Sequence, residues 1–272
     1  MAERTLRIAV VGDLHYDERS RGGLTERFDR VNREADVLAL VGDLTTHGQP
    51  EQMVAFLDEL RVVNVPVVTV LGNHDHEGEA TDQLCAMLDD AGVVVLDGDA
   101  VEIEGVGFTG VKGFAGGFGR AALGPFGEPL IKDFVQAAVD ESLKLERGLR
   151  ELRTEHRVVL LHYAPIADTL VGEPEQIYTF LGSSRLLEPI ETLGADVIFH
   201  GHAHHGTYRG QTPSGIPVYN VSLHVLDAEG LPFHLHHGPA PDRRHRASDG
   251  NGRTERQPRS SDSTSPTTPA SR

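Results

Sequence analysis

LRIAVVGDLH, residues 6–15, is the stretch that decides the fold. Its first part, Leu6–Val11, is a short apolar run rich in β-branched residues and closed by Gly12. Such a run predicts a strand that is buried on both faces. Asp13 and His15 follow directly after it. Because side chains two residues apart in extended backbone project to one side, this Asp-x-His pair presents a carboxylate and an imidazole together.

The same arrangement returns four times along the chain. Ligand sites in open α/β sheets lie at the carboxyl ends of strands, so we expect these polar residues to meet in one site. Val37–Val41 leads to Gly42 and Asp43; Val65–Leu71 leads to Gly72, Asn73, His74 and Asp75; Val158–Leu161 leads to His162; and Val197–Phe199 leads to His200, Gly201, His202 and His204.

Stretches with helical patterns separate these runs. Thr25–Ala35 has Thr25 as its expected N-cap, and Pro50–Arg61 opens with proline in the first turn. The same patterns predict helices over Asp82–Ala91 and Pro129–Glu155. Alternating strands and helices predict a layered α/β domain.

The ends of the chain differ in composition. We expect one domain over residues 1–238. Residues 239–272 are rich in Ser, Thr, Pro and Arg and have almost no large apolar side chain, which predicts a disordered tail.

Charge and composition exclude several classes of protein. The net charge of −16 argues against binding to nucleic acid through its backbone. The sequence shows neither an apolar run long enough to cross a bilayer nor a secretory signal pattern, so we expect no membrane contact and a cytoplasmic location. The single cysteine, Cys85, rules out an internal disulfide and a cysteine zinc finger.

The polar residues after the strands form a mixed set of imidazole nitrogens and carboxylate oxygens. That mixture suits manganese, iron, zinc or cobalt better than calcium. Glycines at positions 12, 42, 72 and 201 are expected to let the backbone turn sharply beyond the strand tips. An acidic chain that binds an anion also needs local positive charge, which bound metals supply.

Taken in order, GDLH, GDLT, GNHD, the histidine of LLHYAP, and GHAH resemble the five motifs of the calcineurin-like metallophosphoesterases, over about Arg7 to Tyr208. The resemblance implies a four-layer α-β-β-α sandwich of two mixed sheets that holds two divalent metal ions (Mn, Fe or Zn). It also implies the role of each matched residue. Asp13, His15 and His204 would hold one metal, Asn73, His162 and His202 the other, and Asp43 would bridge them, with His74 as an unligated catalytic residue oriented by Asp75.

The resemblance further implies hydrolysis of a phosphoester by a metal-bridging hydroxide, with His74 donating a proton to the leaving oxygen. The second motif lacks the Asp-Arg-Gly of protein phosphatases and is more similar to bacterial cyclic-nucleotide and small phosphodiester hydrolases. Tyr163, however, follows His162 where many of those have a second histidine. We therefore expect a small phosphodiester or phosphomonoester as substrate.

Two rival functions remain beside this one. The first is a non-catalytic metal-binding scaffold on the same fold. The second is an amide hydrolase, although those commonly open with His-x-His, whereas this chain opens with Asp-x-His.

Several residues have two interpretations at this stage. His200 is either packed or supports a ligand. The segment at Lys112, Phe114, Phe118 and Arg120 either covers the site and contacts substrate or is an exposed hairpin loop. Substrate-binding residues stay open. The late run FHLHH, residues 233–237, is typical of a terminal strand rather than a metal site.

Overall fold

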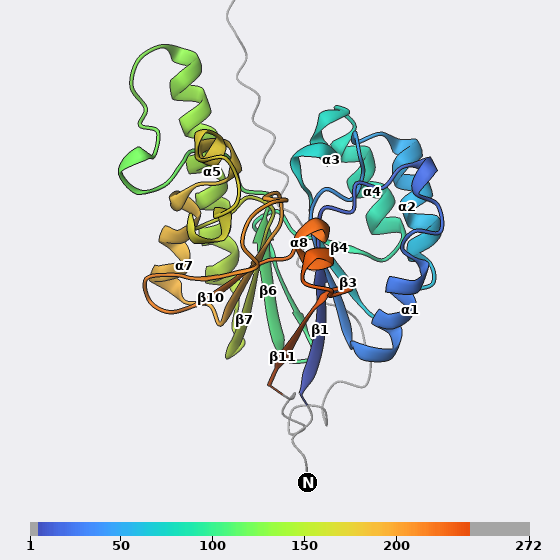
Figure 1. Cartoon of the computed structure of the whole chain (residues 1–272). Helices are drawn as coiled ribbons and strands as arrows, with labels where there is room; N and C mark the ends of the chain where they lie inside the picture. The colour runs from blue at the N-terminus through green and yellow to red at the C-terminus, as the bar shows by residue number, and fades with distance from the viewer. Residues whose placement is uncertain (1–4, 240–272) are drawn as a thin grey trace, which may run out of the picture.

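The computed structural model describes residues 5–239 and contains two mixed sheets packed face to face (Figure 1). The first sheet has the order β11-β1-β2-β3-β4 and is parallel except for its edge strand β11. Its strands are β1 (Leu6–Val11), β2 (Val37–Val41), β3 (Val67–Val70), β4 (Val94–Val95) and β11 (His234–Gly238).

The second sheet has the order β5-β6-β7-β8-β10-β9, with a parallel centre and an antiparallel strand at each edge. Its strands are β5 (Ala100–Ile103), β6 (Val106–Val111), β7 (His156–Leu161), β8 (Val197–His200), β9 (Arg209–Gln211) and β10 (Pro217–Asn220).

Helices cover the outer faces of both sheets and complete four layers (Figure 1). On one side lie α1 (Thr25–Glu34), α2 (Pro50–Leu60), α3 (Asn73–Glu77) and α4 (Thr81–Asp90); on the other lie α5 (Pro129–Glu151) and α7 (Leu187–Leu193). Two short helices, α6 (Tyr178–Leu181) and α8 (Leu223–Ala228), belong to connecting segments. The predicted α-β-β-α sandwich of two mixed sheets is confirmed.

The core explains why the strand sequences are apolar at every position. Alternate residues of the second sheet, such as Phe108, Leu160 and Phe199, join the first sheet in one buried cluster. Their neighbours Val159 and Ile198 face the other way into a cluster that includes residues of α5 and α7. With both faces covered, a strand has no solvent side and hence no polar alternation.

Most elements begin and end close to their predicted bounds, but one cap was assigned wrongly. Thr25 is the first residue of α1, and Leu24 occupies the N-cap without a side-chain hydrogen bond. The Thr25 hydroxyl instead donates to Glu59 Oε1 at 3.0 Å. The prediction of a terminal strand in FHLHH is confirmed, because β11 pairs antiparallel with β1.

The predicted tail, residues 239–272, lies outside the described residues apart from its first residue. Within residues 5–239, no helix combines the length and apolar character needed to cross a membrane.

Candidate metal centre

The seven predicted metal ligands all follow strands whose carboxyl ends meet at one edge of the sandwich. Hydrogen bonds between the loops hold them in register: Asp13 N donates to Gly42 O at 3.0 Å, and His15 N donates to Asp43 O at 2.9 Å. The second sheet joins in the same way, since Gly201 N donates to His162 O at 3.1 Å. The loops of the two sheets meet where His202 N donates to Asp13 Oδ1 at 2.9 Å, so residues 189 positions apart in sequence lie side by side.

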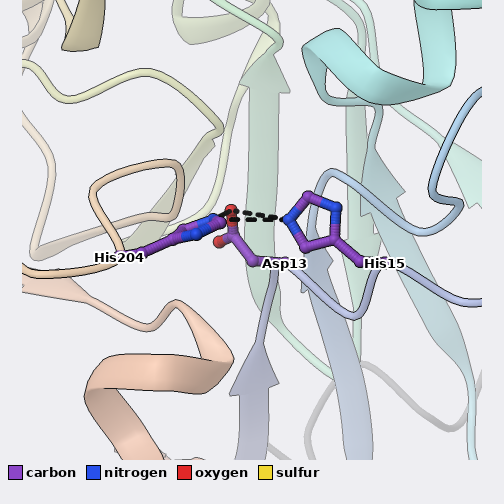
Figure 2. Close-up of side chains that lie close together, drawn as sticks. All are labelled: Asp13, His15 and His204. Atoms are coloured by element: carbon purple, nitrogen blue, oxygen red, sulfur yellow. Dashed lines mark hydrogen bonds and ion pairs between the residues drawn. The ribbon is translucent and has the colours of Figure 1, made fainter.

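The first group contains Asp13, His15 and His204, whose side chains converge in Figure 2. His204 Nε2 lies 2.9 Å from Asp13 Oδ1. His15 Nε2 lies 4.0 Å from the same oxygen and 3.3 Å from His204 Nε2. One carboxylate and two imidazoles thus present three donor atoms to a common point, a set that suits a first-row divalent metal.

The second group contains Asp43, His162 and His202, with Asn73 beside it. His162 Nε2 lies 2.8 Å from Asn73 Oδ1 and 3.3 Å from Asp43 Oδ2. His162 Nδ1 donates to the carbonyl of Val41 at 2.9 Å, which directs Nε2 toward the site. This outer hydrogen bond orients the ring as expected for a metal-binding histidine.

Asp43 lies between the two groups. Its Oδ2 is 3.7 Å from His15 Nε2 and 3.3 Å from His162 Nε2. Its Oδ1 accepts the His74 backbone N–H at 2.8 Å, whereas Oδ2 is buried and accepts no hydrogen bond. A buried carboxylate oxygen without a hydrogen bond is costly unless positive charge lies beside it, and a position between two cations would supply that charge. The residues present therefore fit a pair of metal ions.

The backbone of the site is strained. Six non-glycine residues in the described chain have positive φ angles, and four of them are predicted ligands: Asp13 (58°), His15 (43°), Asp43 (50°) and His202 (69°). Such conformations cost free energy and persist where the surrounding structure holds them for a function.

Close approach, more than turning, explains two of the motif glycines. A Cβ on Gly72 would lie 2.1 Å from Asp43 Oδ1, and one on Gly201 would lie 2.2 Å from Asp13 Oδ2. Neither glycine has a positive φ. Their hydrogen atoms leave the room that the two carboxylates occupy.

The electrostatics of the site favour bound positive charge. Burial works against ionisation of Asp43, but His162 outweighs it and holds the pKa of Asp43 well below its usual range. Burial likewise opposes protonation of His162, yet Asp43 raises the pKa of His162 to about 9. In the metal-free protein the two groups therefore form a buried ion pair, with a proton where a cation would bind.

His74 stands at the edge of the first group, with its ring 4.6 Å from that of His15 and perpendicular to it. Its Nδ1 donates to the carbonyl of Thr46 at 2.6 Å and lies 3.6 Å from Glu77 Oε2. This tautomer leaves Nε2 free.

The structure shows no hydrogen bond between the Asp75 carboxylate and the His74 ring that Asp75 is predicted to orient. The buried Asp75 carboxylate accepts hydrogen bonds from the backbone N–H groups of Leu44, Thr45 and Gly72 and from the Thr45 hydroxyl. It ties the β2 and β3 loops together, because residue 75 turns inward on the first turn of α3 while His74 faces the site.

Other residues near the centre take supporting positions that the sequence did not reveal. Tyr163 packs its ring 4.4 Å from that of His202, and His224 stacks 4.6 Å from His204. The Phe180 carbonyl accepts from His202 Nε2 at 3.2 Å. His200 is packed, bonded to Gly201 O and Thr169 Oγ1 at 2.8 Å each. These contacts depend on loop conformation and leave no motif in the sequence.

Solved structures with the same fold include a hydrolase and an anchor protein. Phosphopantetheinyl hydrolase (PptH) from Mycobacterium tuberculosis aligns at TM-score 0.58 and 18% identity, covering 87% of this chain and 96% of that one. TT1561 of Thermus thermophilus aligns at 0.50 and 16%, covering 87% and 99%. GAP50, described as the anchor in the inner membrane complex of Plasmodium, aligns at 0.51 and 14%, covering 80% and 71%.

By sequence, no curated protein matches the chain significantly. The sequence profile of the calcineurin-like phosphoesterases matches residues 6–206, which include all seven predicted metal ligands. The chain belongs to the calcineurin-like phosphoesterase family.

Proposed function

We propose that this chain is a hydrolase of small phosphoesters that works with two divalent cations. The observation that carries the proposal is the buried Oδ2 of Asp43, which accepts no hydrogen bond and lies between the imidazoles of His15 and His162. In a scaffold without metal, a carboxylate oxygen in that position would have no function. Between two cations it would act as a bridging ligand.

In the proposed site, Asp13, His15 and His204 hold one cation, Asn73, His162 and His202 hold the other, and Asp43 contacts both. The bound pair would lower the pKa of a water molecule and neutralise phosphate oxygens. The protein fixes the distance between the two binding positions through the backbone of Asp13 and Asp43, whose positive φ angles turn both carboxylates inward.

His74 is the proposed proton donor to the leaving oxygen. Its Nδ1–H donates to the Thr46 carbonyl, so the proton given to a leaving oxygen would be the one that Nε2 carries when both ring nitrogens are protonated. Its backbone N–H also donates to Asp43 Oδ1, which fixes the ring relative to the bridging carboxylate. General-acid catalysis of this kind typically contributes roughly 10²- to 10⁴-fold to the rate.

The substrate class remains a small phosphodiester or phosphomonoester, the metals Mn, Fe or Zn, and the location cytoplasmic, all as predictions from the sequence. The net charge of −16 argues against a surface that binds nucleic acid.

The alternative is a non-catalytic metal-binding scaffold. GAP50, which has the same fold, is described as an anchor. Retention of all seven ligands and of His74 favours the enzyme. The test is hydrolysis of p-nitrophenyl phosphate and bis(p-nitrophenyl) phosphate after loading with Mn²⁺, with metal content measured on the same sample. Protein that contains two metals and hydrolyses neither ester would support the scaffold.

A further inference from the structure

Lys112 places a cation beside the second ligand group. It follows β6 at the same sheet edge as the metal centre. Its carbonyl accepts the N–H of His162 at 3.1 Å and the N–H of Tyr163 at 3.0 Å. The backbone of Lys112 is thus fixed directly against a predicted metal ligand.

The ammonium group of Lys112 is held over aromatic rings. Nζ lies 5.0 Å from the centroid of Phe114 and 5.3 Å from that of Tyr163. It donates one hydrogen bond, to the Gly113 carbonyl at 2.8 Å. The rings and this carbonyl restrict where a half-buried ammonium can point.

Within residues 5–239, Lys112 has no carboxylate at ion-pair distance. Glu141 makes its hydrogen bonds elsewhere: Oε2 accepts Gly113 N at 2.7 Å and Oε1 accepts Lys144 Nζ at 2.8 Å. An ammonium carries three donors, so Lys112 can bind a further acceptor.

The other two lysines of the chain do not share this situation. Lys144, on α5, forms ion pairs with Asp97 and with Glu141 of the same helix. Lys132 is exposed near the start of the same helix. Lys112 alone among the three is placed against the predicted centre.

Tyr163 connects this cation to the centre. Its ring packs 4.4 Å from that of His202 and 5.6 Å from that of His162, and Lys112 lies against the same ring. The cation is therefore one aromatic ring away from two predicted ligands of the second metal. An anionic group bound there would be attracted by this cation.

We propose that Lys112 contacts a phosphate oxygen of the substrate and favours phosphomonoesters over phosphodiesters. The inference rests on the proposed function. At neutral pH a monoester carries a charge of roughly −1.5 to −2, whereas a diester carries one negative charge and a second organic group. The additional charge of the monoester gains more from a fixed cation, and the compact Lys ammonium contacts it as a point charge.

The experiment compares Mn²⁺-loaded wild type with K112M and K112Q on p-nitrophenyl phosphate and bis(p-nitrophenyl) phosphate, which share a leaving group. K112M keeps the apolar stem against Phe114 and Tyr163. We expect the ratio of kcat/KM for monoester to that for diester to fall about 10-fold in both variants. We also expect inorganic phosphate, measured by calorimetry, to bind about 10-fold more weakly. K112R should recover part of both losses.

The matched control is K132Q, which removes an exposed lysine and should behave as wild type. Metal content and the unfolding temperature of each variant verify that the site is intact. A ratio and a phosphate affinity that stay within about twofold of wild type in folded, metal-loaded K112M would overturn the inference. If wild type hydrolyses neither ester, the proposed function fails, and the phosphate affinities still decide whether Lys112 contacts the anion.

Discussion

Asp43 and His162 join the two sheets of the sandwich: Asp43 Oδ2 at the end of β2 lies 3.3 Å from His162 Nε2 at the end of β7. Each residue belongs to a different sheet, so the geometry of the second ligand group depends on how the sheets pack. The buried cluster shared by both sheets keeps that packing fixed. The core thereby sets the geometry of the site.

Asp43→Asn is expected to abolish turnover and to reduce metal occupancy at both positions. The amide has no net charge to hold two cations together, and a loss of about 4 kcal/mol in stabilising the reaction corresponds to a rate about 1,000-fold lower. Metal analysis and ester hydrolysis measure the two effects. Asp29→Asn, which alters an exposed aspartate of α1, is the control. Full activity of metal-replete Asp43→Asn protein would contradict the bridging role.

Gly201→Ala is expected to displace the Asp13 carboxylate, because the added Cβ would lie 2.2 Å from Oδ2. Affinity for one of the two metals should fall roughly 10- to 100-fold, while the second position is affected less. Titration with Mn²⁺ monitored by calorimetry resolves the two sites. Gly124→Ala provides the comparison, because a Cβ there meets nothing within 4 Å and should change neither affinity.

The strands and the ligand set were predictable because both leave a pattern in the sequence. A strand buried on both faces is apolar throughout, and polar residues that follow five such strands in a fixed order are informative together although each alone is not. β1 and β2 accordingly match their predicted bounds. Asp75 shows where prediction from the sequence is limited. Its place beside His74 in GNHD suggested contact, but consecutive residues on a helix point in different directions, and only the folded α3 shows which one faces the site.

The edge strands and the aromatic contacts of the predicted ligands were harder to predict from the sequence. β9 and β10 carry mixed sequences because they lie toward an edge and are only partly buried. Tyr163 was noted only as a departure from relatives. Its contact with both His202 and Lys112 follows from the path of a loop, for which apolar periodicity gives no information.

His74→Gln should slow hydrolysis of esters with poor leaving groups more than that of p-nitrophenyl esters. A proton donor matters most when the departing alkoxide is basic, so an alkyl phosphate should lose roughly 10²- to 10⁴-fold and a nitrophenyl ester much less. Rates across a series of phenyl and alkyl esters give the dependence on the pKa of the leaving alcohol. An equal loss of rate for all esters would show that His74 does not donate the proton to the leaving oxygen.

Asp75→Asn should act on stability and not on the leaving-group dependence. The introduced amide N–H₂ would face either the backbone donors of Leu44 and Gly72 or that of Thr45, leaving buried groups unsatisfied. We expect a loss of about 1–3 kcal/mol in the free energy of unfolding. Urea unfolding measures it, and the ester series used for His74 serves as the comparison. A change in leaving-group dependence matching that of His74→Gln would instead support the orienting role.

The stability of the metal-free protein should fall as the pH rises through about 9, the pKa to which Asp43 raises His162. Because the folded-state pKa lies above that of an unfolded histidine, about 6.5, the stabilising contribution of the ion pair is complete below that unfolded value and disappears above the folded one. Mn²⁺ should remove this dependence, since a metal on Nε2 replaces the proton. Unfolding temperatures of wild type and His162→Asn between pH 6 and pH 10, with EDTA or Mn²⁺, isolate the contribution of this residue. Metal-free curves that run parallel for the two proteins across this range would show that His162 is not protonated in the folded state.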